Sequence, residues 1–113
     1  MTYRGSREEN DADRSYNEGV VNATEAGKNF IAEWPQISFI FNTNSEGGLN
    51  LGPQNPSVVN LVERMNNACG GMSLSSVNTV FGRLQNEAIE AGRRVTRYKI
   101  GSQHVTEITP VIS

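Results

Sequence analysis

Cysteine, histidine and tryptophan each occur only once in the 113 residues. The single cysteine, Cys69, excludes an internal disulfide framework and a metal site made of several cysteines. The single histidine, His104, has no cysteine or carboxylate at a ligand-like spacing, so the sequence predicts no metal site and no other cofactor. No catalytic base is placed next to a nucleophile, and we therefore expect a protein that is not an enzyme.

Apolar residues are also scarce. They make up 36% of the chain, and residues 1–15 contain almost none. We expect residues 1–15 to be a flexible N-terminal segment and residues 16–113 to be one domain, since a chain of this length can bury roughly two-thirds of its unfolded surface. No run of eighteen apolar residues and no charged-then-apolar leader occurs, which predicts a cytoplasmic or intracellular protein that does not bind a membrane.

Apolar residues that recur at three- and four-residue spacing predict a long first helix over residues 11–33. Gly19 and Gly27 each weaken this helix by about 1 kcal/mol relative to alanine. Pro35 ends it, because the residue before a proline avoids the helical region.

A strand and a long loop follow this helix. Residues 36–42 alternate in polarity, and their spacing places Ile37, Phe39 and Phe41 on one face of a strand. Residues 43–55 are rich in glycine and proline, which predicts a loop longer than most connections between elements.

Two further helices are recognisable by their ends. The Asn-Pro pair at residues 55–56 suits an N-cap followed by the first helical position, and the glycines at 70–71 stop that helix. Ser73 is the expected N-cap of a third helix over residues 74–91, and Gly92 its C-terminal stop.

Two strands, residues 94–100 and 104–112, close the chain around a short glycine-containing turn. Pro110 has no backbone donor, which predicts that the last strand lies at an edge of the sheet. The whole order of helix, strand, helix, helix, strand, strand predicts an α+β domain with a small antiparallel sheet. This is the element order of a winged helix, and the segment from Glu63 to Leu84 resembles a helix-turn-helix with Gly71 in its turn.

This resemblance implies binding to duplex DNA. The helix over residues 74–91 would be the recognition helix in the major groove, and the basic strand over residues 93–99 would neutralise phosphates. Arginine and small polar side chains are the types that contact base edges and phosphate oxygens. The candidate contact residues are Ser75, Asn78, Thr79 and Arg83 on the helix, with Arg93, Arg94, Arg97 and Lys99 beside the hairpin.

The charge balance leaves a second interpretation open. The formal net charge of −2 argues against nucleic acid, although residues 93–99 hold four basic side chains and the acidic ones concentrate in the first fifty residues. A basic strand can also be a solvated face of an ordinary small domain. The alternative is a protein-interaction or assembly subunit, such as a phage or viral accessory protein that binds a host or virion protein, and a homodimer fits either interpretation.

Overall fold

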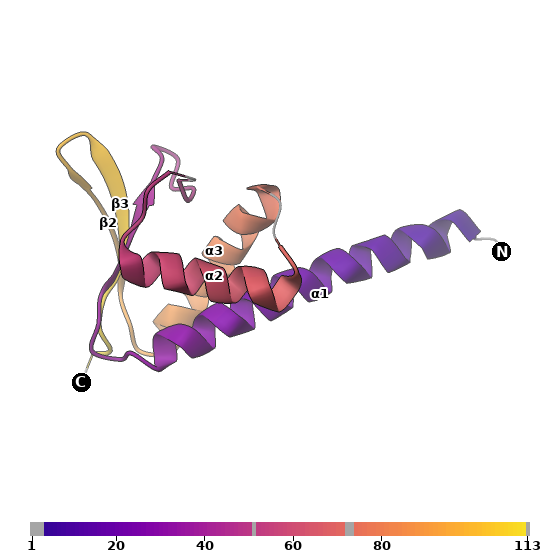
Figure 1. The fold of residues 1–113 in the computed structure, drawn as a ribbon, viewed down its shortest axis with the longest axis horizontal. Helices are drawn as coiled ribbons and strands as arrows, with labels where there is room; N and C mark the ends of the chain where they lie inside the picture. The colour runs from indigo at the N-terminus through magenta and orange to yellow at the C-terminus, as the bar shows by residue number, and fades with distance from the viewer. Residues whose placement is uncertain (1–3, 51, 72–73, 113) are drawn as a thin grey trace.

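The structure is a computed structural model that describes residues 4–50, 52–71 and 74–112, with side chains from residue 17 onward except those of residues 74 and 75. Three helices form one layer and a three-stranded antiparallel sheet forms the other (Figure 1). The elements follow the chain as helix, strand, helix, helix, strand, strand, so the predicted α+β class and element order are confirmed.

Helix α1, Arg4–Ala32, is 29 residues long, and its N-terminal half projects away from the other elements (Figure 1). It begins at Arg4 rather than at residue 11, in a stretch that contains arginine and glutamate, which have high helix propensity. Among the α1 side chains that the structure describes, which start at residue 17, Val20, Phe30 and Ile31 are buried. The division into a flexible segment 1–15 and a domain 16–113 stays a prediction.

Helices α2, Pro56–Cys69, and α3, Leu74–Glu90, pack against α1 at Gly27. A Cβ atom built on Gly27 would lie 2.7 Å from Sδ of Met65 and 3.2 Å from Cδ1 of Leu84. Both of these side chains are buried in the core. The glycine that weakens the isolated helix therefore allows three helices to approach one another.

Glycines end α2 and α3 as predicted. Gly70 takes the left-handed conformation at the end of α2, with φ of 74°, and Gly71 follows with φ of 110°. Gly92 follows α3 with φ of 93°. These backbone angles favour glycine because a side chain would be strained there. Helix α2 begins at Pro56 as expected, whereas the predicted N-cap Ser73 lies outside the described residues.

The sheet has the strand order β1-β3-β2, formed by β1, Phe39–Thr43, β2, Val95–Ile100, and β3, Gln103–Ile108. The prediction of an edge position for the last strand is wrong, because β3 pairs with both β1 and β2. Pro110 does not prevent this pairing, since β3 ends at Ile108. The N–H groups on either side of Pro110 donate to backbone carbonyls at 2.9 and 2.8 Å.

The first strand is shorter than predicted. It begins at Phe39 instead of residue 36, and Ile37 is exposed instead of sharing the buried face of Phe39 and Phe41. The backbone of residues 33–37 instead forms turns, with the N–H of Ile37 bonded to the carbonyl of Trp34 at 3.2 Å.

Side chains on the helix-facing side of the sheet form three rows across the strands. The rows are Val95, Ile108 and Phe39; Arg97, Thr106 and Phe41; and Lys99, His104 and Thr43. The first row packs in the core, and the third lies nearest the tip of the hairpin formed by β2 and β3. The hairpin extends past the helices (Figure 1). Its basic residues Arg97 and Lys99 are therefore exposed to solvent beyond the core row.

The two outer edges of the sheet differ. At β1, the side-chain amide of Gln54 pairs with the backbone of Asn42: its Oε1 accepts from the Asn42 N–H at 2.8 Å, and its Nε2 donates to the Asn42 carbonyl at 2.9 Å. Asn55 also donates to the carbonyl of Ile40 at 3.0 Å. At the opposite edge, none of the described strands pairs with the outer side of β2.

Candidate nucleic-acid interface

Helix α3, the candidate recognition helix, is buried on one side only. Its core side chains are Val80, Phe81, Leu84 and Ala88. Of its exposed residues, Asn78, Gly82, Arg83 and Asn86 form what we call the α3 stripe, and Ile89 and Glu90 are exposed at its C-terminal end. A Cβ atom built on Gly82 would meet nothing within 4 Å, so the helix backbone is accessible in the middle of the stripe. Thr79 is partly buried and has an interaction of its own, and the side chain of Ser75 lies outside the described part of the chain.

Asn78 connects the α3 stripe to the loop after β1. Its Oδ1 accepts the N–H of Leu49 at 3.3 Å, and Leu49 is buried and forms an isolated bridge with Thr43. The loop therefore lies against the N-terminal half of α3. Asn78 acts first as an anchor for this loop, which limits how freely its side chain can reach a ligand.

Arg83 lies on the α1 side of the stripe. It lines a hollow of about 310 Å³ with Glu25 of α1 and Glu87 of α3. The Nζ atom of Lys28 lies 3.1 Å from Oε1 of Glu87. This hydrogen bond lowers the pKa of Glu87 and raises the pKa of Lys28. Two carboxylates thus lie close to Arg83 and reduce the local positive charge.

Arg93 has a structural position instead of the predicted DNA contact. It is only 3% exposed. Its guanidinium donates to the carbonyls of Ile31 at 2.6 Å, Trp34 at 2.5 Å and Ile37 at 3.1 Å. Burial lowers the pKa of Arg93, although a guanidinium stays charged in proteins. Arg93 therefore ties the end of α1 to the segment that precedes β1, and its buried guanidinium is not placed to contact a phosphate.

Arg94, Arg97 and Lys99 are exposed, but they do not share one face. Strand alternation places Arg97 and Lys99 on the helix-facing side of the sheet and Arg94 on the opposite side. Nη2 of Arg97 donates to Oε1 of Gln85 at 3.1 Å, which ties the hairpin to α3. The structure therefore brings Arg97 and Lys99 together on one face, places Arg94 on the other face of the sheet and buries Arg93.

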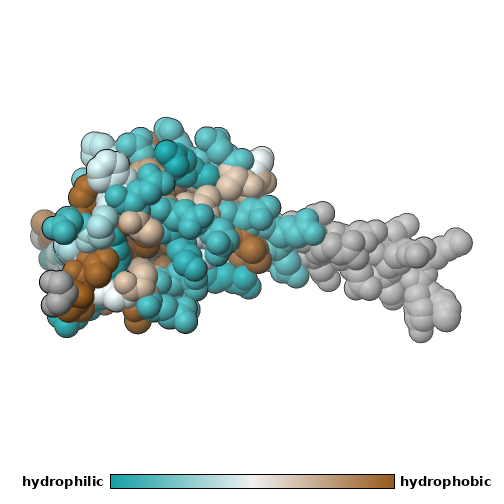
Figure 2. All heavy atoms as spheres, turned by 90° about the horizontal axis from the view of Figure 1, so that it is seen from below, coloured by the Kyte–Doolittle hydropathy of each residue, from teal (hydrophilic) through white to brown (hydrophobic). Residues whose placement is uncertain are grey.

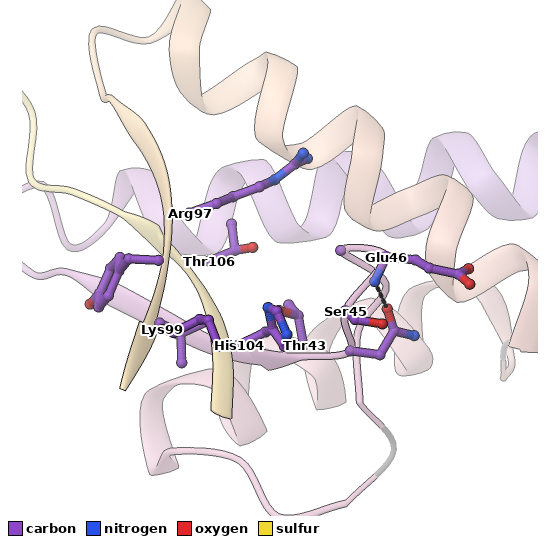
Figure 3. Close-up of a pocket in the computed structure, with 11 residues that line it drawn as sticks. Thr43, Ser45, Glu46, Arg97, Lys99, His104 and Thr106 are labelled. Atoms are coloured by element: carbon purple, nitrogen blue, oxygen red, sulfur yellow. Dashed lines mark hydrogen bonds between the residues drawn. The ribbon is translucent and has the colours of Figure 1, made fainter. Parts of the chain in front are cut away.

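A cleft of about 300 Å³ opens between the hairpin and the turn of residues 44–47, and we call it the hairpin cleft (Figure 3). Arg97, Lys99, His104 and Thr106 line it from the hairpin, and Thr43, Ser45 and Glu46 line it from the other side. The turn is shaped by Asn44, whose Oδ1 accepts the N–H groups of Glu46 and Gly48, both at 2.9 Å. The carboxylate of Glu46 points away from the cleft (Figure 3).

Sequence reasoning missed the contributions of His104 and Thr106 to this cleft. The sequence contains a weak indication of this arrangement. If the two C-terminal strands pair through a two-residue turn, Lys99 lies opposite His104 and Arg97 lies opposite Thr106. The turn of residues 44–47 comes from a loop more than fifty residues away in the chain, and no local pattern indicates its position.

Comparison of the chain with protein-family models gives no match, and comparisons with curated proteins and with solved structures give none either. In the ranges that the structure describes, no group of three or more histidine, cysteine or carboxylate residues is arranged to hold a metal ion. No helix within those ranges is both long and apolar enough to span a membrane. By its fold, the protein is a small α+β domain with a three-stranded antiparallel sheet.

Proposed function

We propose that this protein binds duplex DNA in the manner of a winged helix-turn-helix, with α3 as the recognition helix and the β2–β3 hairpin as the wing. The observation that carries the proposal is the α3 stripe, which is polar, exposed and accessible at the backbone of Gly82. The hairpin lies next to α3 through the hydrogen bond between Arg97 and Gln85. A helix flanked by a basic hairpin can follow the major groove and an adjacent phosphate strand.

The proposed set of DNA-contacting residues is smaller than the set that the sequence alone predicts. Arg83 and Asn86 of the α3 stripe are assigned to base edges and neighbouring phosphates, and Arg97 and Lys99, on the α3 side of the sheet, to phosphates beside the wing. Arg93 is left out because its guanidinium is bonded to three backbone carbonyls. About three cationic side chains are then assigned to phosphates. We therefore expect weak binding, in which the logarithm of the binding constant falls with the logarithm of salt concentration with a slope of about −3.

The test is fluorescence anisotropy of labelled, pooled random-sequence duplexes across a range of salt concentrations. Lys99→Gln is expected to weaken binding to all sequences alike and to reduce the salt slope by about 1. Arg83→Gln is expected to weaken one selected sequence more than the pool. Arg64→Gln is the matched control, because Arg64 is an exposed arginine on α2 that lies 5.3 Å from the ring centroid of Phe30, outside the stripe and the hairpin.

Two results contradict the proposal. One is the absence of any anisotropy change with the pooled duplexes at the lowest salt concentration. The other is an equal loss of affinity for Arg64→Gln and Lys99→Gln, which points to a diffuse charge effect without a defined interface.

A second candidate function, protein assembly, is favoured by an apolar patch beside the C-terminus. Trp34, Ile37, Val111 and Ile112 are 47%, 38%, 40% and 58% exposed. The N–H of Val111 donates to the carbonyl of Pro35 at 2.8 Å, which brings the two segments together. Figure 2 shows apolar surface gathered beside the grey atoms at the left end of the molecule. Exposed apolar patches that contain tryptophan are typical of protein interfaces.

For this candidate, we propose a second copy of the chain as the partner. Light scattering at increasing concentration is expected to show a mass that rises toward that of a dimer, and Trp34→Ser is expected to abolish the rise. Val59→Ser is the control, because Val59 is 41% exposed but lies on α2, away from the patch. A strict monomer at high concentration excludes this assembly.

A further inference from the structure

The hairpin cleft contains a polar group that the fold leaves without a partner. Thr106 is 0% exposed, and among the described residues its Oγ1 is a buried side-chain oxygen with no hydrogen bond. A buried hydroxyl without a partner is unfavourable for folding, because it loses its hydrogen bonds to water and gains none in return. Its oxygen points toward the space between the hairpin and the turn of residues 44–47 (Figure 3). A ligand in this cleft could supply the missing partner.

Positive charge surrounds the same hydroxyl. Arg97 lies directly across the strand pair from Thr106, and Lys99 and His104 form the next row toward the hairpin tip. The guanidinium of Arg97 extends over Thr106 toward α3, where one of its five N–H groups is used by Gln85 (Figure 3). The nearest acidic side chain in the lining, Glu46, is directed outward (Figure 3). The cleft therefore offers donors and net positive charge.

We propose that the hairpin cleft binds a phosphoryl group, with Arg97 and Lys99 as its cationic ligands and the hydroxyl of Thr106 as an additional donor. Charge-assisted hydrogen bonds from a guanidinium and an ammonium are the usual means of holding phosphate oxygens. At about 300 Å³ the cleft exceeds the size of phosphate alone, so it has room for part of the molecule to which the phosphate is attached. Because Thr106 is fully buried and Arg97 extends over it, the side chain of Arg97 must shift for the hydroxyl to contact a bound phosphoryl group.

Two sources can supply this group: the backbone of a nucleic acid or a free phosphorylated small molecule. The inference does not depend on the proposed DNA interface, because inorganic phosphate alone is the probe. Its binding is measured by amide chemical shifts of the ¹⁵N-labelled protein, with sodium chloride at matched ionic strength as reference. We expect saturable shifts confined to residues 44–47 and 97–106.

Three variants test the assigned ligands. Lys99→Gln is expected to weaken phosphate binding about tenfold, the loss typical of one charge-assisted hydrogen bond. Thr106→Val keeps the shape of the side chain and removes the hydroxyl, so we expect it to melt no lower than the unmodified protein without phosphate and yet to bind phosphate more weakly. Lys28→Gln is the control, because Lys28 lies on α1 beside Glu87, and it is expected to leave phosphate binding unchanged.

Competition with a short DNA duplex distinguishes the two sources. Displacement of phosphate, with shifts in the same residues, assigns the cleft to a backbone phosphate. Failure of the duplex to displace bound phosphate assigns it to a free phosphorylated molecule, whether or not the duplex binds at α3. The inference is overturned if phosphate shifts these amides no more than sodium chloride does, or if Lys28→Gln and Lys99→Gln weaken binding equally. Either of these results leaves the DNA proposal standing on its own test.

Discussion

Arg93 and Arg94 are neighbours of the same residue type with opposite environments. The guanidinium of Arg93 is buried under the α1–β1 connection, whereas the side chain of Arg94 is exposed to solvent. The sequence could not distinguish them, because the three carbonyls that Arg93 contacts lie 56 to 62 residues earlier in the chain. Local patterns identify a basic segment but cannot show which of its charges the fold uses internally.

This difference predicts unequal effects on stability. Arg93→Ala leaves three carbonyls without their donor, and we expect the free energy of unfolding to fall by about 2–4 kcal/mol. Arg94→Ala is the matched control and is expected to change it by less than about 0.5 kcal/mol. Urea unfolding followed by circular dichroism measures both, and equal losses would contradict the structural role of Arg93.

At the scale of elements, most of the helix and strand order could be predicted, since caps, glycine stops and apolar spacing are local features. The ends of α2 and α3 lie at Gly70 and Gly92 because of these signals. The position of β3 could not be predicted in the same way. A strand is central or at an edge according to which distant strands pair with it, and Pro110 merely follows the last paired residue, Ile108.

Helix packing gives opposite expectations for two glycines of α1. At Gly19, a Cβ atom would lie 3.8 Å from Cβ of Cys69, an ordinary contact, so Gly19→Ala is expected to stabilise the protein by about 0.5–1 kcal/mol. At Gly27 the new methyl would press on buried Met65, and we expect Gly27→Ala to destabilise by about 1–3 kcal/mol. Thermal unfolding of the two variants measures the difference, and stabilisation by both would contradict the close packing at Gly27.

The hairpin contains a pH-sensitive contact on its outer face. The hydroxyl of Tyr98 donates to Oε1 of Glu107 at 2.8 Å, and this hydrogen bond raises the pKa of Tyr98 above its usual 10.0. Because the folded-state pKa is raised, the stability from this contact is present below pH 10 and is lost as the pH rises through the folded-state pKa. Glu107→Ala is expected to return the pKa of Tyr98 toward its usual value.

Ultraviolet absorbance titration measures the tyrosinate that forms, and a Tyr98→Phe variant assigns the change to this residue. Unchanged titration in Glu107→Ala would show that the carboxylate does not hold the phenol proton.

At the scale of the whole molecule, the protein is elongated. Its principal extents are 55 × 31 × 21 Å, and its radius of gyration is 15.7 Å, against about 13 Å for a compact chain of this length. Much of the excess comes from α1, whose N-terminal half projects from the body (Figure 1).

This shape predicts the effect of a truncation. Residues 1–15 contain almost no apolar side chains, so we expect their deletion to change the free energy of unfolding by less than about 0.5 kcal/mol while the hydrodynamic radius falls. Urea unfolding and size-exclusion chromatography measure the two quantities. A large loss of stability would show that residues 16–113 do not form the domain by themselves.

The amide of Gln54 has a consequence for how far the protein can associate. It occupies the backbone of Asn42 in the way that a neighbouring strand would, so the β1 side of the sheet is closed to further pairing. Among the described strands, β2 has the outer edge that no neighbouring strand covers, so this side remains open to another strand. If two copies join there, a closed β1 faces outward at each end of the combined sheet, and growth stops at a pair instead of continuing as a fibre.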